Sequence, residues 1–357
     1  KNKKIYFRIF LSMLLVLSNF ALFRSVQGWK NGSYANNPAD FDCNTDYGSH
    51  DWIADAILDY LLEINANRWN WLDERREIYY VGTEAPDNSK VSFIADGQTL
   101  SGFGDTSLHH IYFYENGTVF ENEDDSAIRA KLCADWAEVS INEEKWDSAA
   151  FYLGALTHYI ADMSMYAHVT DNDVAPYYLN FDEHHSTIEG YVNTRTNEFD
   201  DCEEFFQLKI NITQIIPQSA YNATVALAWD TFADPNPSKS FSRDSIWLHE
   251  QFFSGWALTL ASRNSETNAT KIAYYDRIEE NLNNAISTGI SVFLNIGQTI
   301  GGTLDQAADD NDTDSTNSDE NSPTPKRFIS FTSWELVFIS FSITMFVITL
   351  NEKRKFL

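Results

Sequence analysis

Histidines and carboxylates in one part of the chain are spaced as metal ligands are spaced. His158 and Asp162 stand four residues apart, and so do His185 and Glu189, so a helix would place both members of each pair on one face. His168 lies between the two pairs. Imidazole and carboxylate groups bind zinc, and such pairs on facing helices can build a multinuclear site inside a bundle. The spacing therefore predicts a zinc site.

A plainer interpretation competes with this one. A single His-x-x-x-Asp pair on a helix is often a hydrogen bond on a solvated face, and short motifs carry a real risk of false matches. Here, however, the first pair follows an apolar stretch, AAFYLGAL, and two pairs accompany His168. A charge buried in such a helix without a partner is costly, and metal ligation removes that cost. We therefore favour the metal interpretation.

Helical patterns dominate the part of the chain that must position these residues. Apolar residues recur at intervals of three and four, as in helices with one face toward a core. The stretches with this pattern are residues 49–64, 126–141, 146–163, 184–206, 219–232 and 274–297. Strand alternation is scarce. The sequence predicts an all-α fold, a compact multi-helix domain over residues 29–302.

The N-terminal residues 1–28 have the features of a signal peptide: a basic start, an apolar stretch, and small residues before a cleavage point after Gly28. An uncleaved anchor is the alternative. Cleavage would leave Trp29 as the new N-terminus, with a free amine that can bind metal. Asn-x-Ser/Thr sequons follow, so we expect N-glycans on an exported protein. They begin at Asn31, Asn116, Asn211, Asn222, Asn268 and Asn311.

The C-terminal part changes character twice. Residues 303–327 are rich in Asp, Asn, Ser and Thr, which predicts an acidic, disordered stalk. Residues 328–350 are mostly apolar and long enough to span a bilayer, and the basic tail 351–357 is typical of a cytoplasmic flank. A lipid-anchor signal is the alternative, although such signals usually end in apolar residues. We expect a single-pass transmembrane helix that holds the domain on the outer face of a cell membrane.

Charge and cysteine content exclude two classes of protein. The formal net charge is -27, which argues against binding nucleic acid through bulk charge. Cys43, Cys133 and Cys202 contain no CxxC pair, so a zinc ribbon is not expected. An odd count allows one disulfide and leaves one thiol over.

As a set, the motifs resemble the zinc-dependent phospholipase C family over about residues 29–300. The segment AFYLGALTHYIADMSMYAH is similar to the family's apolar helix that runs into His-Tyr-x-Gly-Asp and Pro-x-His. The segment HSTIEGYV resembles its His-x-x-x-Glu motif, GSHDWIADAILDYL its first helix, and HIYFYENG the segment that supplies another histidine. In this family the mature chain begins with a tryptophan whose amine and carbonyl oxygen bind zinc, which gives Trp29 a function.

The resemblance implies three zinc ions and assigns their ligands. The ligands would be Trp29, His50 and a bridging Asp162 for the first ion; Asp87, His110, His158 and the same Asp162 for the second; and His168, His185 and Glu189 for the third. Asp87 would also accept a proton from the attacking water. Two assignments are choices between neighbours. His110 is preferred to His109 because HIYFYENG keeps the family's spacing, and Asp87 is preferred to Glu84 because related sequences have a Pro-Asp pair here.

The resemblance implies a phospholipase C that cleaves glycerophospholipids to diacylglycerol and a phosphorylated headgroup through a zinc-activated water. A single-strand zinc nuclease is the nearest alternative, because those enzymes share the fold and nearly the same ligands. They tend to have a histidine soon after the N-terminal tryptophan and Asp in place of Glu189, whereas His50 here comes 21 residues after Trp29. The other alternative is a non-catalytic zinc-binding surface glycoprotein. We expect a phospholipid substrate and no nucleic acid.

Overall fold

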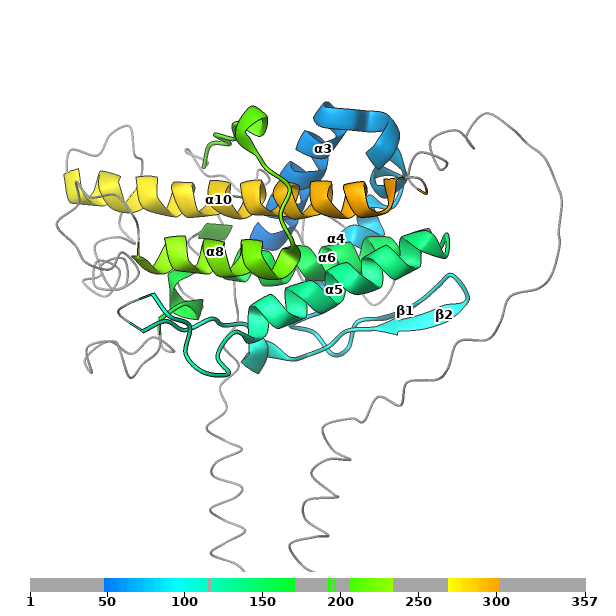
Figure 1. Ribbon diagram of the computed structural model, residues 1–357, viewed down its shortest axis with the longest axis horizontal. Helices are drawn as coiled ribbons and strands as arrows, with labels where there is room; N and C mark the ends of the chain where they lie inside the picture. The colour runs from blue at the N-terminus through cyan, green and yellow to red at the C-terminus, as the bar shows by residue number, and fades with distance from the viewer. Residues whose placement is uncertain are drawn as a thin grey trace, which may run out of the picture. The chain divides into compact units, whose positions relative to one another are not determined.

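Five of the six helices expected from apolar periodicity form, while the sixth, over residues 184–206, lies almost entirely outside the described residues. The computed structural model describes residues 48–114, 117–170, 192–193, 196, 206–233, 269–301 and 303. Within them the chain is mostly helical, as predicted (Figure 1). The α-helices are α3 (Ser49–Asp73), α4 (Arg76–Glu84), α5 (Asp125–Asn142), α6 (Trp146–Asp162), α8 (Ala220–Ala233) and α10 (Ala269–Thr299). Of these, α4 was not expected from the sequence.

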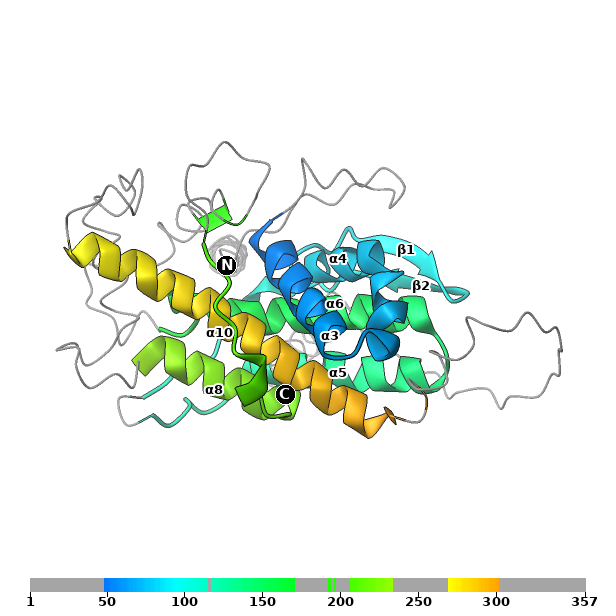
Figure 2. The ribbon, with the colours of Figure 1, turned by 90° about the horizontal axis from the view of Figure 1, so that it is seen from above.

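Helix α6 is the centre of the packing. It contacts α3, α4, α5 and α10, and α10 packs in turn against α3 and α8 (Figures 1 and 2). From Phe151 to Asp162 every residue except Tyr152 is buried. A helix that is apolar on all sides is stable only inside a protein. Polar side chains on α6, such as His158, therefore need partners within the core.

Two glycines bring α4 unusually close to α6. A Cβ atom built on Gly154 would lie 2.1 Å from the carbonyl oxygen of Tyr79, and one built on Gly82 would lie 2.2 Å from the carbonyl oxygen of Phe151. No side chain fits between the helices at this crossing. The contact fixes the C-terminal end of α4, and with it the residues from Thr83 to Asp87, against α6.

A β-hairpin corrects the expectation of an all-helical domain. Strands β1 (Ser92–Ala95) and β2 (Gln98–Ser101) are antiparallel and are joined by Asp96 and Gly97. Both turn residues have positive φ, 49° and 74°. Asp-Gly between two strands is a strong signal for this kind of turn, so the sequence did contain it.

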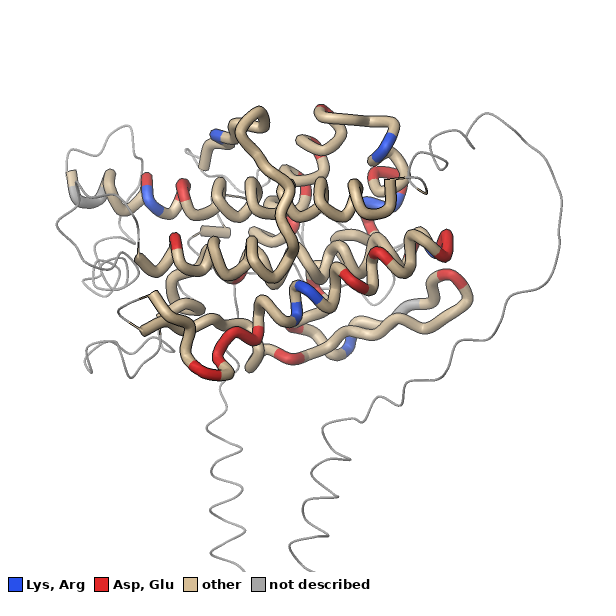
Figure 3. The backbone as a smooth tube through the Cα atoms, in the orientation of Figure 1, with Lys and Arg blue, Asp and Glu red and all other residues tan. Residues whose placement is uncertain are grey.

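The predicted terminal segments lie outside the described residues, apart from residue 303. No helix among the described residues is long and apolar enough to cross a bilayer. The predicted span 328–350 lies outside the described residues. The signal peptide, stalk, span and tail, and the domain boundaries that they define, stay predictions. Along the described backbone, acidic residues are conspicuous at the start of α5 (Figure 3).

Candidate metal centre

Buried ligand-type side chains converge from four parts of the chain. The first turn of α3 supplies one histidine, and the end of α6 supplies a histidine and an aspartate. The segment after α4 supplies a second aspartate. A third histidine follows the 3-10 turn η2 (Thr106–Leu108). In chain order these residues are His50, Asp87, His109, His158 and Asp162.

The ligand atoms of His109 and His158 lie close to each other and to one oxygen of each of two aspartates. His109 Nδ1 lies 3.0 Å from Asp162 Oδ2, 3.2 Å from His158 Nε2 and 3.4 Å from Asp87 Oδ1. His158 Nε2 lies 3.1 Å from the same oxygen of Asp162 and 3.8 Å from that of Asp87. All four side chains are buried or nearly so; the most exposed, that of Asp87, is 9% accessible.

The separations from His109 and His158 to each other and to the two carboxylates are those of ligands around a zinc ion. Zinc binds imidazole nitrogen and carboxylate oxygen at about 2.0–2.2 Å, so two ligand atoms of a tetrahedral site are about 3.3–3.5 Å apart. The distances here, from 3.0 to 3.8 Å, bracket that value. The donor set of two imidazoles and two carboxylates is also one that zinc accepts. The residues present therefore fit the metal that the sequence predicts.

Asp162 also faces a second group through its other oxygen. Its Oδ1 atom lies 3.2 Å from His50 Nε2. The His50 ring stacks on that of His158, with centroids 4.1 Å apart and an angle of 3° between the planes. The two oxygens of Asp162 therefore face different histidines: Oδ1 faces His50, and Oδ2 faces His109 and His158. This arrangement suits a carboxylate shared between two metal sites.

Burial sets the charge state of this cluster. Loss of solvent, followed by repulsion from His158, lowers the pKa of His50 to about 4, although Asp162 partly offsets this. His50 is therefore neutral at pH 7, the form that binds metal. Burial opposes ionisation of Asp162, yet the attraction of His158 and His168 holds its pKa well below the usual range. The aspartate is therefore a carboxylate, also the ligand form.

Backbone carbonyls orient two of the histidines. His158 Nδ1 lies 2.7 Å from the carbonyl oxygen of Thr83, and His168 Nδ1 is hydrogen-bonded to the carbonyl oxygen of His109. A carbonyl only accepts, so both Nδ1 atoms carry the proton and Nε2 has the lone pair. In His158 this is the nitrogen that faces the cluster. His168 is buried completely.

The structure does not bring His110 into the cluster, and His109 takes the place predicted for it. His110 Nε2 lies 2.6 Å from Glu123 Oε2, and its ring stacks on that of Tyr112. Its side chain is 16% exposed, against 0% for His109. The two neighbouring side chains leave the backbone in different directions after the turn η2. The pair Asp105 and His109, four residues apart, was a signal that could have favoured His109.

Of the other predicted ligands, the structure places His50, Asp87, His158 and Asp162 together. Asp87, rather than Glu84, belongs to the cluster, although Glu84 is also buried. Trp29, His185 and Glu189 lie outside the described residues. Their assignments, and with them a third group around His168, stay predictions.

Comparison with known proteins identifies a family. A model of the family described as zinc-dependent phospholipase C matches residues 49–234, which include every residue of the cluster. None of the curated proteins compared with the chain matches it.

Proposed function

This chain belongs to the zinc-dependent phospholipase C family, and we propose that it is a phospholipase C that hydrolyses glycerophospholipids to diacylglycerol and a phosphorylated headgroup. The observation that carries the proposal is the pair of buried, overlapping ligand groups that share His158: His50 and Asp162 on one side, and Asp87 and His109 on the other. Membership of the family supports hydrolysis of a phosphodiester. The lipid substrate is the finer part of the proposal.

Zinc in this site would supply a water molecule with a pKa lowered from about 15.7 toward about 7, together with positive charge for the phosphoryl oxygens. The residues of the chain would bind and orient the metal ions. His109, His158 and Asp162, whose side chains are buried, would hold the metal. His50 and Trp29 would complete a second site across Asp162, and His168, His185 and Glu189 a third.

Asp87 would act as the general base in addition to binding the metal. Its side chain, at 9% exposure, is the most accessible carboxylate of the cluster, while Asp162 is completely buried. A carboxylate at the open side of the site can accept a proton from the attacking water as the water oxygen bonds to phosphorus. The phosphorus–oxygen bond to glycerol then breaks, and the diacylglycerol oxygen takes up a proton.

The membrane setting is part of the proposal. A phospholipid substrate suits an exported, N-glycosylated protein that a C-terminal helix holds on the outer face of a membrane. The family match leaves this setting open, and it rests on the sequence patterns of residues 1–28 and 328–350.

The test is an assay of purified protein on phosphatidylcholine vesicles and, in parallel, on single-stranded DNA. We expect release of phosphorylated headgroup, loss of activity with a chelator, and recovery with zinc. Asp87→Asn should lower the rate by about 100- to 10,000-fold, the usual worth of a general base. Glu84→Gln is the matched control and should keep the rate within a few fold.

Two results would overturn the proposal. Cleavage of DNA without cleavage of lipid would make the chain a nuclease. Full zinc occupancy with no turnover of either substrate would make it a non-catalytic zinc-binding protein.

A further inference from the structure

We propose that Asp105 is a positioning residue of the metal centre. Its carboxylate holds the imidazole of His109 in the tautomer and orientation in which Nδ1 faces the other ligands. Asp105 precedes the turn η2, four residues before His109, and is not itself within the cluster. The inference rests on the proposed metal centre and extends it to a residue that binds no metal.

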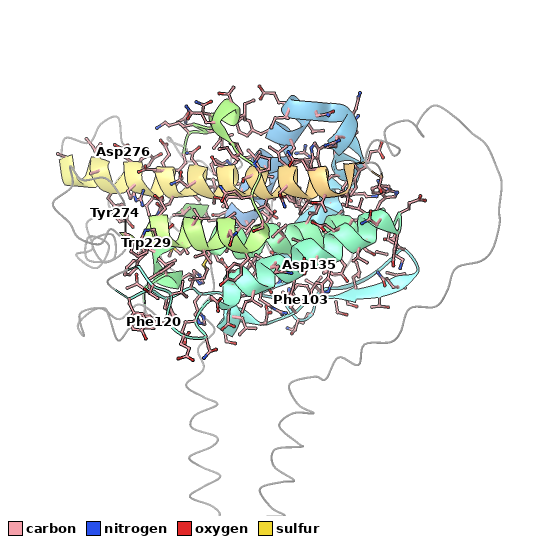
Figure 4. All side chains as sticks on the ribbon, in the orientation of Figure 1. Phe103, Phe120, Asp135, Trp229, Tyr274 and Asp276 are labelled. Carbon is pink, nitrogen blue, oxygen red and sulfur yellow. The ribbon has the colours of Figure 1, made fainter. Side chains whose placement is uncertain are left out.

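The Asp105 carboxylate is itself held from two sides. The hydroxyl group of Tyr159 donates to it, at 2.7 Å from Oδ1 and 3.0 Å from Oδ2. The guanidinium group of Arg129 donates to Oδ2 in an ion pair. Arg129 lies over the rings of Phe103 and Tyr159, with its central carbon 5.3 and 5.9 Å from their centroids. Phe103 lies beside α5 in Figure 4. The side chain of Asp105 is 12% exposed, so this network is largely shielded from solvent.

The contact with His109 has a defined polarity. Asp105 Oδ1 lies 3.3 Å from His109 Nε2. A carboxylate paired with an arginine can only accept, so Nε2 carries a proton, and in the neutral imidazole that binds metal Nδ1 then has the lone pair. Nδ1 is the atom that lies 3.0 Å from Asp162 Oδ2 and 3.2 Å from His158 Nε2. The ring of Tyr159 meets that of His109 edge-on, at 82° and 5.1 Å, and limits its rotation.

Asp105 also joins the two segments that carry ligands. Its backbone N–H donates to the carbonyl of Pro86, at 2.9 Å, next to Asp87. The carbonyl of His109 in turn accepts from His168 Nδ1. A shift of the segment after Asp105 would therefore disturb Asp87, His109 and His168 together. A carboxylate behind a metal-binding histidine fixes the ring and makes it a stronger ligand.

The test is Asp105→Asn in the full chain, which keeps the shape of the side chain and removes its charge. We expect zinc affinity, measured by competition with a chelating dye, to fall about 10- to 100-fold. The visible spectrum of the cobalt-substituted protein should change as well. Asp96→Asn is the matched control. Asp96 accepts two hydrogen bonds of 2.8 Å from Ser148 at the start of α6, so this variant tests loss of a structural carboxylate without touching the centre.

The outcomes separate this inference from the proposed function. If the wild-type chain binds no zinc, the metal centre itself is refuted. If it binds zinc and Asp105→Asn keeps the affinity and the cobalt spectrum, the role of Asp105 is refuted alone. Should Asp105→Asn fail to fold, Tyr159→Phe removes one donor from the carboxylate and is expected to weaken zinc binding about fivefold. Unchanged affinity in that variant would overturn the inference equally.

Discussion

The Nδ1 atom of His109 lies 3.2 Å from the Nε2 atom of His158, and their ring planes are nearly perpendicular, at 73°. When each ring is neutral, as metal binding requires, both nitrogens carry the lone pair, because the single proton of each ring is engaged on the far side, by Asp105 and by the carbonyl of Thr83. Two lone pairs that face each other repel unless a cation lies between them. This pair of histidines is therefore arranged for a metal ion rather than for a hydrogen bond.

The two neighbouring histidines should consequently behave differently. His109→Ala is expected to lower zinc affinity more than about 100-fold, because even partners outside the ligand set are worth about 10- to 100-fold. His110→Ala should keep zinc content and activity near those of the wild type, since the contacts it loses, with Glu123, Asp125 and Tyr112, lie outside the cluster. Metal analysis after dialysis, with the lipid assay, measures both. Equal losses in the two variants would show that the segment moves when metal binds.

The close contact of α4 with α6 at Gly82 and Gly154 predicts that one added methyl group lowers the free energy of unfolding. Gly154→Ala would place a methyl group 2.1 Å from the carbonyl oxygen of Tyr79, so α4 would have to move away from α6. Overpacking of this kind costs about 1–3 kcal/mol, which outweighs the gain of about 1 kcal/mol from higher helix propensity. Urea unfolding of the metal-free protein measures the difference.

Gly297→Ala in α10 is the control for that experiment. Its new Cβ would meet Trp69 at 3.3 Å, a contact that a slight shift of the ring relieves. The free energy of unfolding should change by less than about 1 kcal/mol. A neutral Gly154→Ala would mean that α4 and α6 are not held as close as described.

Acid should destabilise the metal-free protein. The pKa of His50 is about 4 in the folded state and about 6.5 when unfolded, so the unfolded chain binds more protons between these values. Stability should therefore fall as pH drops from about 6.5 to about 4, by up to about 3 kcal/mol. Asp162, whose folded pKa is also lowered, adds a further loss below about pH 4.

Urea unfolding of the chelator-treated protein at several pH values tests this dependence. His50→Gln should remove most of the slope between pH 6.5 and 4 while the loss at lower pH persists. A wild-type protein whose stability is flat over that range would argue that His50 is not buried as a neutral imidazole.

Cys133 should be an inert thiol. It is a free cysteine, buried on α5, and burial raises its pKa to about 12. A thiol reagent should leave it unmodified in the native protein and label it in urea, because the thiolate is the reactive form. If the exported chain forms one disulfide, it would then join Cys43 and Cys202. Peptide mapping without reduction would contradict this by finding Cys133 in a disulfide.

The apolar periodicity of the sequence correctly predicted which residues share a face of one helix. His158 and Asp162 share a face of α6, and the apolar sequence around them correctly indicated that they are buried. The spacing of these residues was sufficient because a helix has a fixed geometry.

The positions of residues in the segments that connect the helices could not be predicted from periodicity. The choice between His109 and His110 depends on backbone angles after a 3-10 turn, and on partners such as His158 and His168 that only the tertiary structure brings close. Helix α4 was missed because it is short and carries charged residues at its start. The hairpin was missed although its Asp-Gly turn was visible in the sequence.

Anomalous scattering at the zinc edge, from crystals of the zinc-loaded protein, tests the central claim most directly. We predict a peak at about 2.0–2.2 Å from His109 Nδ1, His158 Nε2, Asp162 Oδ2 and a carboxylate oxygen of Asp87. A peak beside His110 and Glu123 instead, or no peak within reach of Asp162, would contradict it.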